Sequence, residues 1–142
     1  MGKWDLRFLD MAALVKSWSK DPSTHIGAVI VKDNRVISTG YNGFPPGIAD
    51  DERLNVREDK YKLVVHAELN AILNAAKHGI ALKGTTIYVD GLHACSACAK
   101  AIVCAGITRV VMRQKCDVAH WVDSLSEAKA ILEEAGVEIE TS

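Results

Sequence analysis

The sequence lacks a long hydrophobic segment, a secretory signal and an excess of charge of either sign. No run approaches the roughly 18 to 20 consecutive apolar residues that a membrane-spanning helix needs, and the N-terminus is charged within its first five residues. The chain carries 17 Lys and Arg against 18 Asp and Glu, whereas proteins that bind a nucleic-acid backbone cluster basic residues. We therefore expect a cytoplasmic protein that acts on a small molecule, with no membrane partner and no stable nucleic-acid partner.

Cysteine is also scarce, and its spacing is more informative than its number. Four cysteines are too few for a disulfide scaffold, and cytosolic thiols are kept reduced. Cys95 and Cys98 form a C-x-x-C pair, while Cys104 and Cys116 stand alone. The sequence has no internal repeat, low-complexity tract or sign of a second domain. Its 142 residues are therefore expected to form a single domain spanning residues 1–142.

Hydrophobic periodicity predicts alternating helices and strands. Residues 4–19 have the pattern of an amphipathic helix, and the positions expected to face the core are Trp4, Phe8, Met11, Ala12, Val15 and Trp18. The other elements are expected as strand 26–31, strand 36–41, helix 63–76, strand 85–89, helix 96–105, strand 108–112, a helix from Ser124 and strand 137–139. This order predicts the α/β class, with a five-stranded mixed sheet covered by helices on both faces. The first two strands are expected to form a hairpin, and the third and fourth a parallel crossover unit.

One long loop interrupts this pattern between residues 43 and 60. It contains two prolines and eight charged residues. Loops of this length inside a compact domain are usually functional or mobile.

A histidine and two cysteines have the composition and spacing of a zinc site. His66 is expected at the start of one helix, and Cys95 and Cys98 at the start of another, where the helix dipole favours thiolate over thiol. A C-x-x-C pair alone would be a redox pair or half of a structural zinc site as readily as part of a catalytic zinc site. The sequence offers no second C-x-x-C and no His pair to complete four ligands. Three protein ligands leave the fourth tetrahedral position open, which is typical of catalytic zinc.

Glu68 lies two residues from His66 and is not needed as a ligand. Its carboxylate is expected to take a proton from the metal-activated water and to pass it to the substrate. The pattern His-x-Glu followed by Cys-x-x-Cys resembles the signature of zinc nucleobase deaminases. The expected reaction replaces an exocyclic amine by oxygen, with Glu68 protonating the ring nitrogen and then the departing ammonia.

A larger set of segments resembles the deoxycytidylate deaminases, over nearly the whole chain from Trp4 to about Glu140. These segments are Asp21-Pro22-Ser23-Thr24, Gly27-Ala28-Val29-Ile30-Val31, Gly40-Tyr41-Asn42-Gly43 with Pro45, His66-Ala67-Glu68-Leu69-Asn70-Ala71-Ile72 and Cys95-Ser96-Ala97-Cys98-Ala99-Lys100. The resemblance implies a three-layer α/β/α cytidine-deaminase-like fold, a Zn²⁺ cofactor and conversion of dCMP to dUMP, which supplies thymidylate synthesis. It also implies a hexamer, with dCTP and dTTP as effectors.

The resemblance further implies that Asn42 binds the sugar and that the backbone around Ala67 reads the pyrimidine edge. Tyr-Asn-Gly is also a common turn signal, so a purely structural role for Asn42 stays open. A phosphate needs cations or convergent N–H and hydroxyl donors. The residues considered for phosphate or effector binding are Ser23, Thr24, His25, Arg53, Arg57 and Lys60, although a solvated charged surface is the default explanation for each of the last three.

One position departs from the family pattern. Ala94 stands where the family has proline before the first cysteine. Alanine should leave the zinc ligands intact but could alter the wall of the pocket, because proline would stiffen the chain and remove a backbone N–H.

The alternatives are a deaminase of cytidine, guanine or transfer-RNA adenosine, and an inactive zinc module that binds nucleotides. Glu68 argues against the inactive zinc module, because a purely structural zinc site has no need of a group that carries protons.

Overall fold

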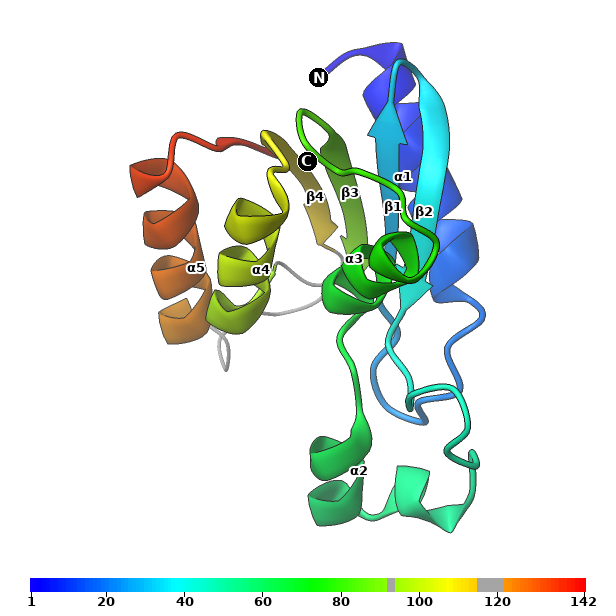
Figure 1. Cartoon of the computed structure of the whole chain (residues 1–142). Coiled ribbons are helices and arrows are strands. Elements are labelled where there is room, and N and C mark those ends of the chain that lie inside the picture. Colours follow the sequence, from blue (N-terminus) through cyan, green and yellow to red (C-terminus); the bar gives the residue numbers. More distant parts are fainter. Residues whose placement is uncertain (92–93, 115–121) are drawn as a thin grey trace.

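The structure is a computed structural model that describes residues 1–91, 94–114 and 122–142 (Figure 1). Its elements are α1 (Lys3–Lys16), β1 (Gly27–Lys32), β2 (Arg35–Tyr41), the 3-10 helix η1 (Glu52–Asn55), α2 (Arg57–Leu63), α3 (Ala67–Lys77), β3 (Thr86–Gly91), α4 (Ser96–Ala105), β4 (Arg109–Gln114), α5 (Val122–Glu134) and β5 (Glu138–Thr141). None of the helices in these described ranges has the length and apolar character to cross a membrane.

The five strands form one mixed sheet in the order β2-β1-β3-β4-β5. β1 is antiparallel to both β2 and β3, whereas β3, β4 and β5 are parallel to one another. The predicted hairpin and the predicted parallel pair are thus confirmed. Parallel strands need a long connection between them, and α4 provides it between β3 and β4.

Helices cover both faces of the sheet, which confirms the three-layer α/β/α prediction (Figure 1). Successive side chains of a strand point to opposite faces. On β1, Val29 and Val31 pack with α1, while Ala28 and Ile30 face the core shared by α3, α4 and α5. Both faces of β1 are buried, which explains its nearly continuous apolar run.

The first helix differs from its prediction in length and in the direction of its apolar face. It ends at Lys16, so Trp18 lies beyond it and is 50% exposed. The buried face is centred on Phe8, Leu9 and Ala12. Trp4 and Met11 lie at the border of that face and remain 44% and 41% exposed. The apolar spacing identified the helix correctly, but the buried face is rotated towards Leu9, which was not among the predicted core positions, and away from Trp4 and Met11.

The long charged loop contains more structure than the sequence analysis expected. The helix predicted from residue 63 begins at Ala67 as α3, and α2 precedes it, mostly within the predicted loop, with an extended segment at Val64 and Val65 between the two helices. Val65 forms an isolated antiparallel bridge with Gly43. We call residues 44–64 the arm, because the chain leaves the body at Gly43 and returns at Val65.

Gly40 allows β2 and α3 to approach each other closely. A Cβ at this position would lie 2.4 Å from the Ala67 carbonyl oxygen and 2.4 Å from the Ala71 amide nitrogen, both of which are backbone atoms that cannot move aside easily. We predict that Gly40→Ala lowers the free energy of unfolding by about 3 kcal/mol. Urea denaturation checks this value. Gly43→Ala is the matched control, because its Cβ would meet nothing nearer than 3.8 Å. Equal stability of the two variants would contradict the prediction.

Candidate metal centre and active site

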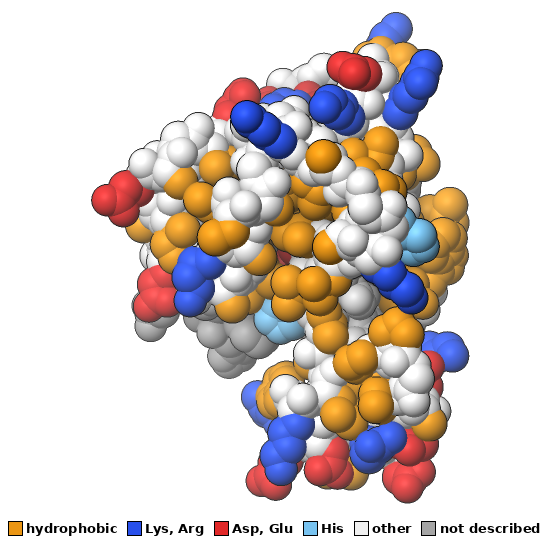
Figure 2. All heavy atoms as spheres, in the orientation of Figure 1, with side chains coloured by type: hydrophobic (Ala, Val, Ile, Leu, Met, Phe, Trp, Pro, Cys, Tyr) orange, Lys and Arg blue, Asp and Glu red, His pale blue; other side chains and the backbone are white. Residues whose placement is uncertain are grey.

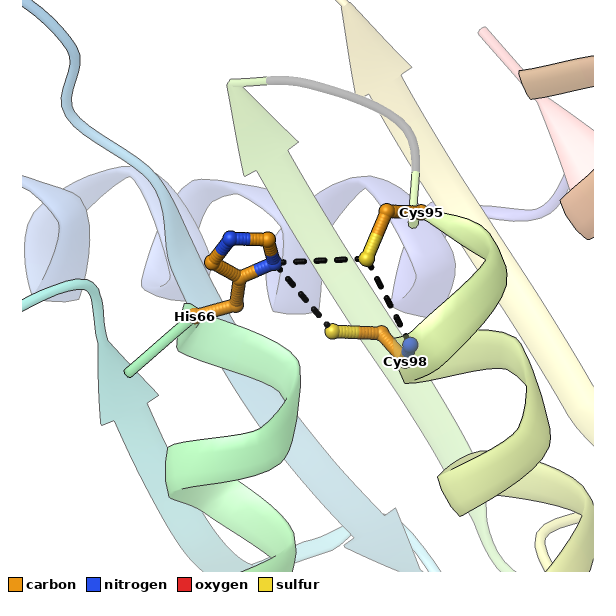
Figure 3. Close-up of side chains that lie close together, drawn as sticks. All are labelled: His66, Cys95 and Cys98. Atoms are coloured by element: carbon orange, nitrogen blue, oxygen red, sulfur yellow. Dashed lines mark hydrogen bonds between the residues drawn. The ribbon is translucent and has the colours of Figure 1, made fainter. Parts of the chain in front are cut away.

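His66, Cys95 and Cys98 come together where α3 and α4 begin (Figure 3). The His66 Nδ1 atom lies 3.3 Å from the Cys95 Sγ and 3.5 Å from the Cys98 Sγ. The three ligand atoms all lie within 4.8 Å of one another, as a single metal ion would require. His66 is exposed, Cys95 is half-buried and Cys98 is buried, so the cluster is open to solvent on the histidine side.

Each ligand group lies at a helix N-terminus, as the sequence predicted. His66 is the residue before the first turn of α3, and Cys95 is the residue before the first turn of α4. The Cys95 sulfur accepts a hydrogen bond from the Cys98 amide at 3.4 Å. Hydrogen bonds from Cys98 and His66 hold the pKa of Cys95 far below its usual value, to about 3. The neighbouring Cys98 and His66 side chains, together with the amide at the helix N-terminus, thus favour a thiolate at Cys95.

Glu68 lies in the first turn of α3 and is almost completely buried, with 2% exposure. Its Oε1 atom has no hydrogen-bond partner, and no other buried side-chain polar atom in the described residues is left unpaired. Burial raises the pKa of Glu68 to about 7, against the lowering effects of Cys98 and His66. A buried polar atom without a partner is costly and usually has a functional explanation. Here the free oxygen belongs to a carboxyl group beside three metal-binding side chains.

This donor set fits zinc. One imidazole and two thiolates are favoured zinc ligands, and three protein ligands leave one tetrahedral position for water or substrate. The unpaired Glu68 oxygen is the kind of group that such a water would satisfy. Among the residues described, no other His, Cys, Asp and Glu side chains form a group of this kind. Cys104 is exposed and separate from the cluster, and Cys116 lies outside the described residues.

Asn42 holds the segment that precedes β1. Its Oδ1 accepts a hydrogen bond from the Ile26 amide at 2.9 Å, and its Nδ2 donates to the Thr24 carbonyl at 2.8 Å. The backbone bridge between Gly43 and Val65 then places this stretch beside the chain that leads into His66. Asn42 therefore has the structural role that its turn signal allowed, next to the metal-binding cluster.

Ser23 and Thr24 form a tight turn around Asp21. The Asp21 Oδ1 atom accepts hydrogen bonds from the Ser23 amide at 2.9 Å, the Ser23 hydroxyl at 3.0 Å and the Thr24 amide at 3.1 Å. The ring of His25 makes a hydrogen bond of 2.6 Å with the Asp21 carbonyl oxygen. The same turn lies against the end of β3, because a Cβ on Gly91 would be 2.6 Å from the His25 carbonyl oxygen.

The three basic residues of the arm differ in their surroundings. Arg53 donates from Nε to Asp51 within the arm at 2.8 Å, and the guanidinium of Arg57 lies over the Tyr61 ring, 5.3 Å from its centroid. Lys60 is buried, and its Nζ lies 3.3 Å from Asp21 Oδ1 and 3.0 Å from Ser23 Oγ. Only Lys60 among the three contacts the turn at Ser23.

The sequence analysis did not single out two buried carboxylates that hold parts of the chain together. Asp21 organises the turn just described. Asp90, at the end of β3, is fully buried and pairs with Lys16 and Arg113, both at 2.5 Å. Asp90 has no local signal, because Lys16 and Arg113 lie far from it in the sequence, whereas the turn at Asp21 is local and only its pairing with Lys60 is distant. Ala94, which replaces the family proline, is buried in the core beside α4 with 1% exposure.

The comparisons with known proteins agree with this geometry. Residues 2–114 match the family model described as the cytidine and deoxycytidylate deaminase zinc-binding region. A protein of Aliivibrio fischeri, described as an uncharacterized deaminase in the luxG 3′ region, is 41% identical over 98% of this chain and 93% of its own length. The deoxycytidylate deaminase of Homo sapiens is 39% identical over 95% of this chain and 77% of its own length.

The dCMP deaminase of the cyanophage S-TIM5 is similar in structure, with a TM-score of 0.79 and 25% identity over the whole of both chains. The family model covers most of the chain, including all three metal-binding residues. The protein therefore belongs to the family of cytidine and deoxycytidylate deaminases.

Proposed function

We propose that this protein is a zinc-dependent hydrolase that converts dCMP and water to dUMP and ammonia, and so supplies dUMP for thymidylate synthesis. The observation that carries the proposal is the buried, unpaired Glu68 oxygen beside the cluster of His66, Cys95 and Cys98. The choice of dCMP as substrate rests on relatives named deoxycytidylate deaminase, which are 39% identical over nearly the whole chain.

Separate residues of this chain would bind the metal and transfer the protons. His66, Cys95 and Cys98 would hold the zinc, which when bound supplies a Lewis acid and lowers the pKa of water. Glu68 accepts a proton from the attacking water and donates it to the pyrimidine ring nitrogen. Glu68 then takes the remaining proton from the hydroxyl group added to the ring carbon and passes it to the exocyclic amine, so that the C–N bond breaks, ammonia leaves and the carbonyl of dUMP forms. A carboxyl group whose pKa burial raises to about 7 can both accept and donate protons near neutral pH.

The nucleotide would lie between the start of α3 and the turn at Ser23. Ala67 is the first residue of α3, where backbone N–H groups have no partner within the helix, and its amide would donate to the pyrimidine edge. Asn42 would bind the sugar with the amide hydrogen and lone pair that its structural bonds leave free. Ser23, Thr24 and His25 would surround the phosphate, with donors from the Thr24 hydroxyl and the Nδ1 side of the His25 ring, because Asp21 already accepts both amides and the Ser23 hydroxyl. Arg53 and Arg57 on the arm would contribute to binding of an effector.

The remaining proposals concern the whole protein. The chain acts as one deaminase domain over residues 1–142, assembles as a homo-hexamer and responds to dCTP and dTTP. It works in the cytoplasm, where cysteine thiols stay reduced and available to zinc. Its partners are small nucleotides, with no membrane and no stable nucleic-acid partner.

A substrate panel tests the proposed reaction. The zinc-loaded protein is incubated with dCMP, deoxycytidine, cytidine, guanine and adenosine nucleotides, and ammonia release is measured. We expect the highest kcat/KM for dCMP, because the turn at Ser23 would recognise the phosphate. Release of ammonia from unphosphorylated compounds alone would overturn the choice of dCMP, and release from none of them would overturn the deaminase assignment.

A further inference from the structure

The arm is attached to the rest of the molecule by few contacts. In Figure 1, η1 and α2 stand apart from the sheet and its covering helices, and in Figure 2 the surface narrows where the arm joins the body. Among the described helices and strands, η1 and α2 pack only against each other. Apart from the bridge between Gly43 and Val65, side chains must therefore hold the arm in place.

Two ion pairs connect the arm to the segment before β1, and they differ greatly in burial. Lys20 and Asp50 form one at 3.1 Å, with side chains 70% and 37% exposed. Exposed pairs of this kind contribute little to stability. Lys60 and Asp21 form the other at 3.3 Å, with side chains only 11% and 5% exposed. Removing one partner of a buried pair leaves an uncompensated charge, which is costly. Of the two ion pairs, the Lys60 pair is thus the one that can help to fix the position of the arm.

The same ion pair also sets the shape of the turn at Ser23. Asp21 Oδ1 accepts the two amides and the hydroxyl that define the turn, and Lys60 supplies the positive charge beside that oxygen. Burial alone would raise the pKa of Asp21. The hydrogen bonds from Ser23 and Thr24, together with the charge of Lys60, outweigh that effect and lower it. Asp21 therefore stays ionised and can keep accepting all of these donors.

The Ser23 hydroxyl lies between the two charges. It donates to Asp21 at 3.0 Å and accepts from Lys60 at 3.0 Å, so its orientation is fixed from both sides. Asn42 fixes the other end of the turn through the Thr24 carbonyl. A turn held at both ends offers a preorganised surface to a ligand, which reduces the entropy lost on binding.

We propose that Lys60 is a positioning residue for substrate binding, which couples the arm to the Ser23–Thr24 turn through Asp21. This inference rests on the proposed function, in which that turn surrounds the phosphate of dCMP. Lys60 acts on the substrate through the turn and not by contact with the phosphate. Any ligand or contact that displaces the arm would then change the affinity for dCMP and leave the zinc-binding residues untouched.

A double-mutant cycle on Lys60 and Asp21 tests the proposal with dCMP as substrate. We expect Lys60→Met to raise KM about 10-fold with kcat within about 2-fold of the starting protein, because the zinc cluster lies outside the turn. Asp21→Asn should have a similar effect, and the double variant should be no worse than the more severe single variant. Lys60→Arg keeps the charge and should restore KM to within about 3-fold. If the two effects on KM multiply, Lys60 acts independently of Asp21 and the proposal is overturned.

Lys62→Met is the matched control, because Lys62 lies on the same helix but is exposed. We expect its KM to be unchanged, and a rise equal to that of Lys60→Met would overturn the specific role of Lys60. Lys60→Gln provides a second neutral variant should Lys60→Met not fold, which circular dichroism and thermal melting would reveal.

Hydrogen–deuterium exchange without substrate separates this inference from the proposed function. We expect Lys60→Met to speed exchange at the Ser23 and Thr24 amides and across the arm, relative to Lys62→Met. Unchanged exchange would overturn the coupling, whatever the substrate is. Faster exchange in a protein that does not deaminate dCMP would support the coupling and reject dCMP as the ligand that the turn serves.

Discussion

Replacing Glu68 with glutamine is expected to lower kcat for dCMP deamination by about 10³-fold, with zinc content and fold retained. Glutamine has nearly the same size and shape as glutamate, so the packing of this buried side chain is preserved. It cannot accept or donate the protons that the reaction moves. The loss should therefore fall on kcat, because the groups proposed to bind the nucleotide remain in place.

Steady-state ammonia release measures this effect, and metal analysis and thermal melting check the zinc content and the fold. Glu127→Gln is a matched control, because Glu127 is an exposed residue on α5, away from the cluster. That variant should retain full activity. A Glu68→Gln protein that kept kcat within about 10-fold of the starting protein would show that another group moves the protons.

The metal-binding residues could be predicted from the sequence because each part of the pattern is local. Cys95 and Cys98 are three residues apart at the start of α4, a spacing that places both sulfurs at the same helix end. His66 and Glu68 likewise fall at the start of α3. The sheet order, which places β1 next to β3 and which the sequence analysis did not predict, then brings the two helix N-termini together.

The role of Lys60 could not be predicted, because it depends on contacts between distant segments. Lys60 and Asp21 are 39 residues apart, and a charged residue in a charged loop has no local feature that marks it as buried. A signal for α2 did exist. Glu58 and Asp59 lie in its first turn and Lys60 and Lys62 in its last, as the helix dipole favours. In the sequence analysis, the high charge of residues 43–60 favoured a loop over a helix.

The periodicity of apolar residues also could not predict which side of α1 is buried. Trp4 and Met11 have the spacing of core residues, but the helix meets the sheet through Phe8, Leu9 and Ala12. Which side of a wide apolar stripe becomes buried depends on the twist of the sheet beneath it and on where the helix ends. The sequence shows neither.

The second large effect is expected for Cys98→Ser, which should weaken zinc binding by more than about 100-fold and abolish deamination. Mutation of a residue that only hydrogen-bonds to a metal ligand already lowers the affinity for the metal roughly 10-fold to 100-fold. Cys98 is itself placed to bind the metal, so its loss should have a larger effect. Its Sγ lies 3.5 Å from the His66 Nδ1 atom, on the buried side of the cluster. The serine oxygen lies closer to its Cβ than the cysteine sulfur does, and it is a harder ligand than a thiolate. The serine hydroxyl also stays protonated at neutral pH.

Comparison of zinc-loaded and chelator-treated proteins separates loss of the ligand from loss of packing. A metal that binds the folded state alone stabilises it, by about 4 kcal/mol at a free concentration 1,000 times Kd. The starting protein should therefore melt at a much higher temperature when zinc is added, whereas Cys98→Ser should gain at most about 1.4 kcal/mol at the same zinc concentration. After chelator treatment, any difference in melting temperature between the starting protein and Cys98→Ser measures the stability lost by placing a hydroxyl group at this buried position. Cys104→Ser is the matched control, since Cys104 is exposed and separate from the cluster. A Cys98→Ser protein that bound zinc as tightly as Cys104→Ser would refute the assignment of Cys98 as a ligand.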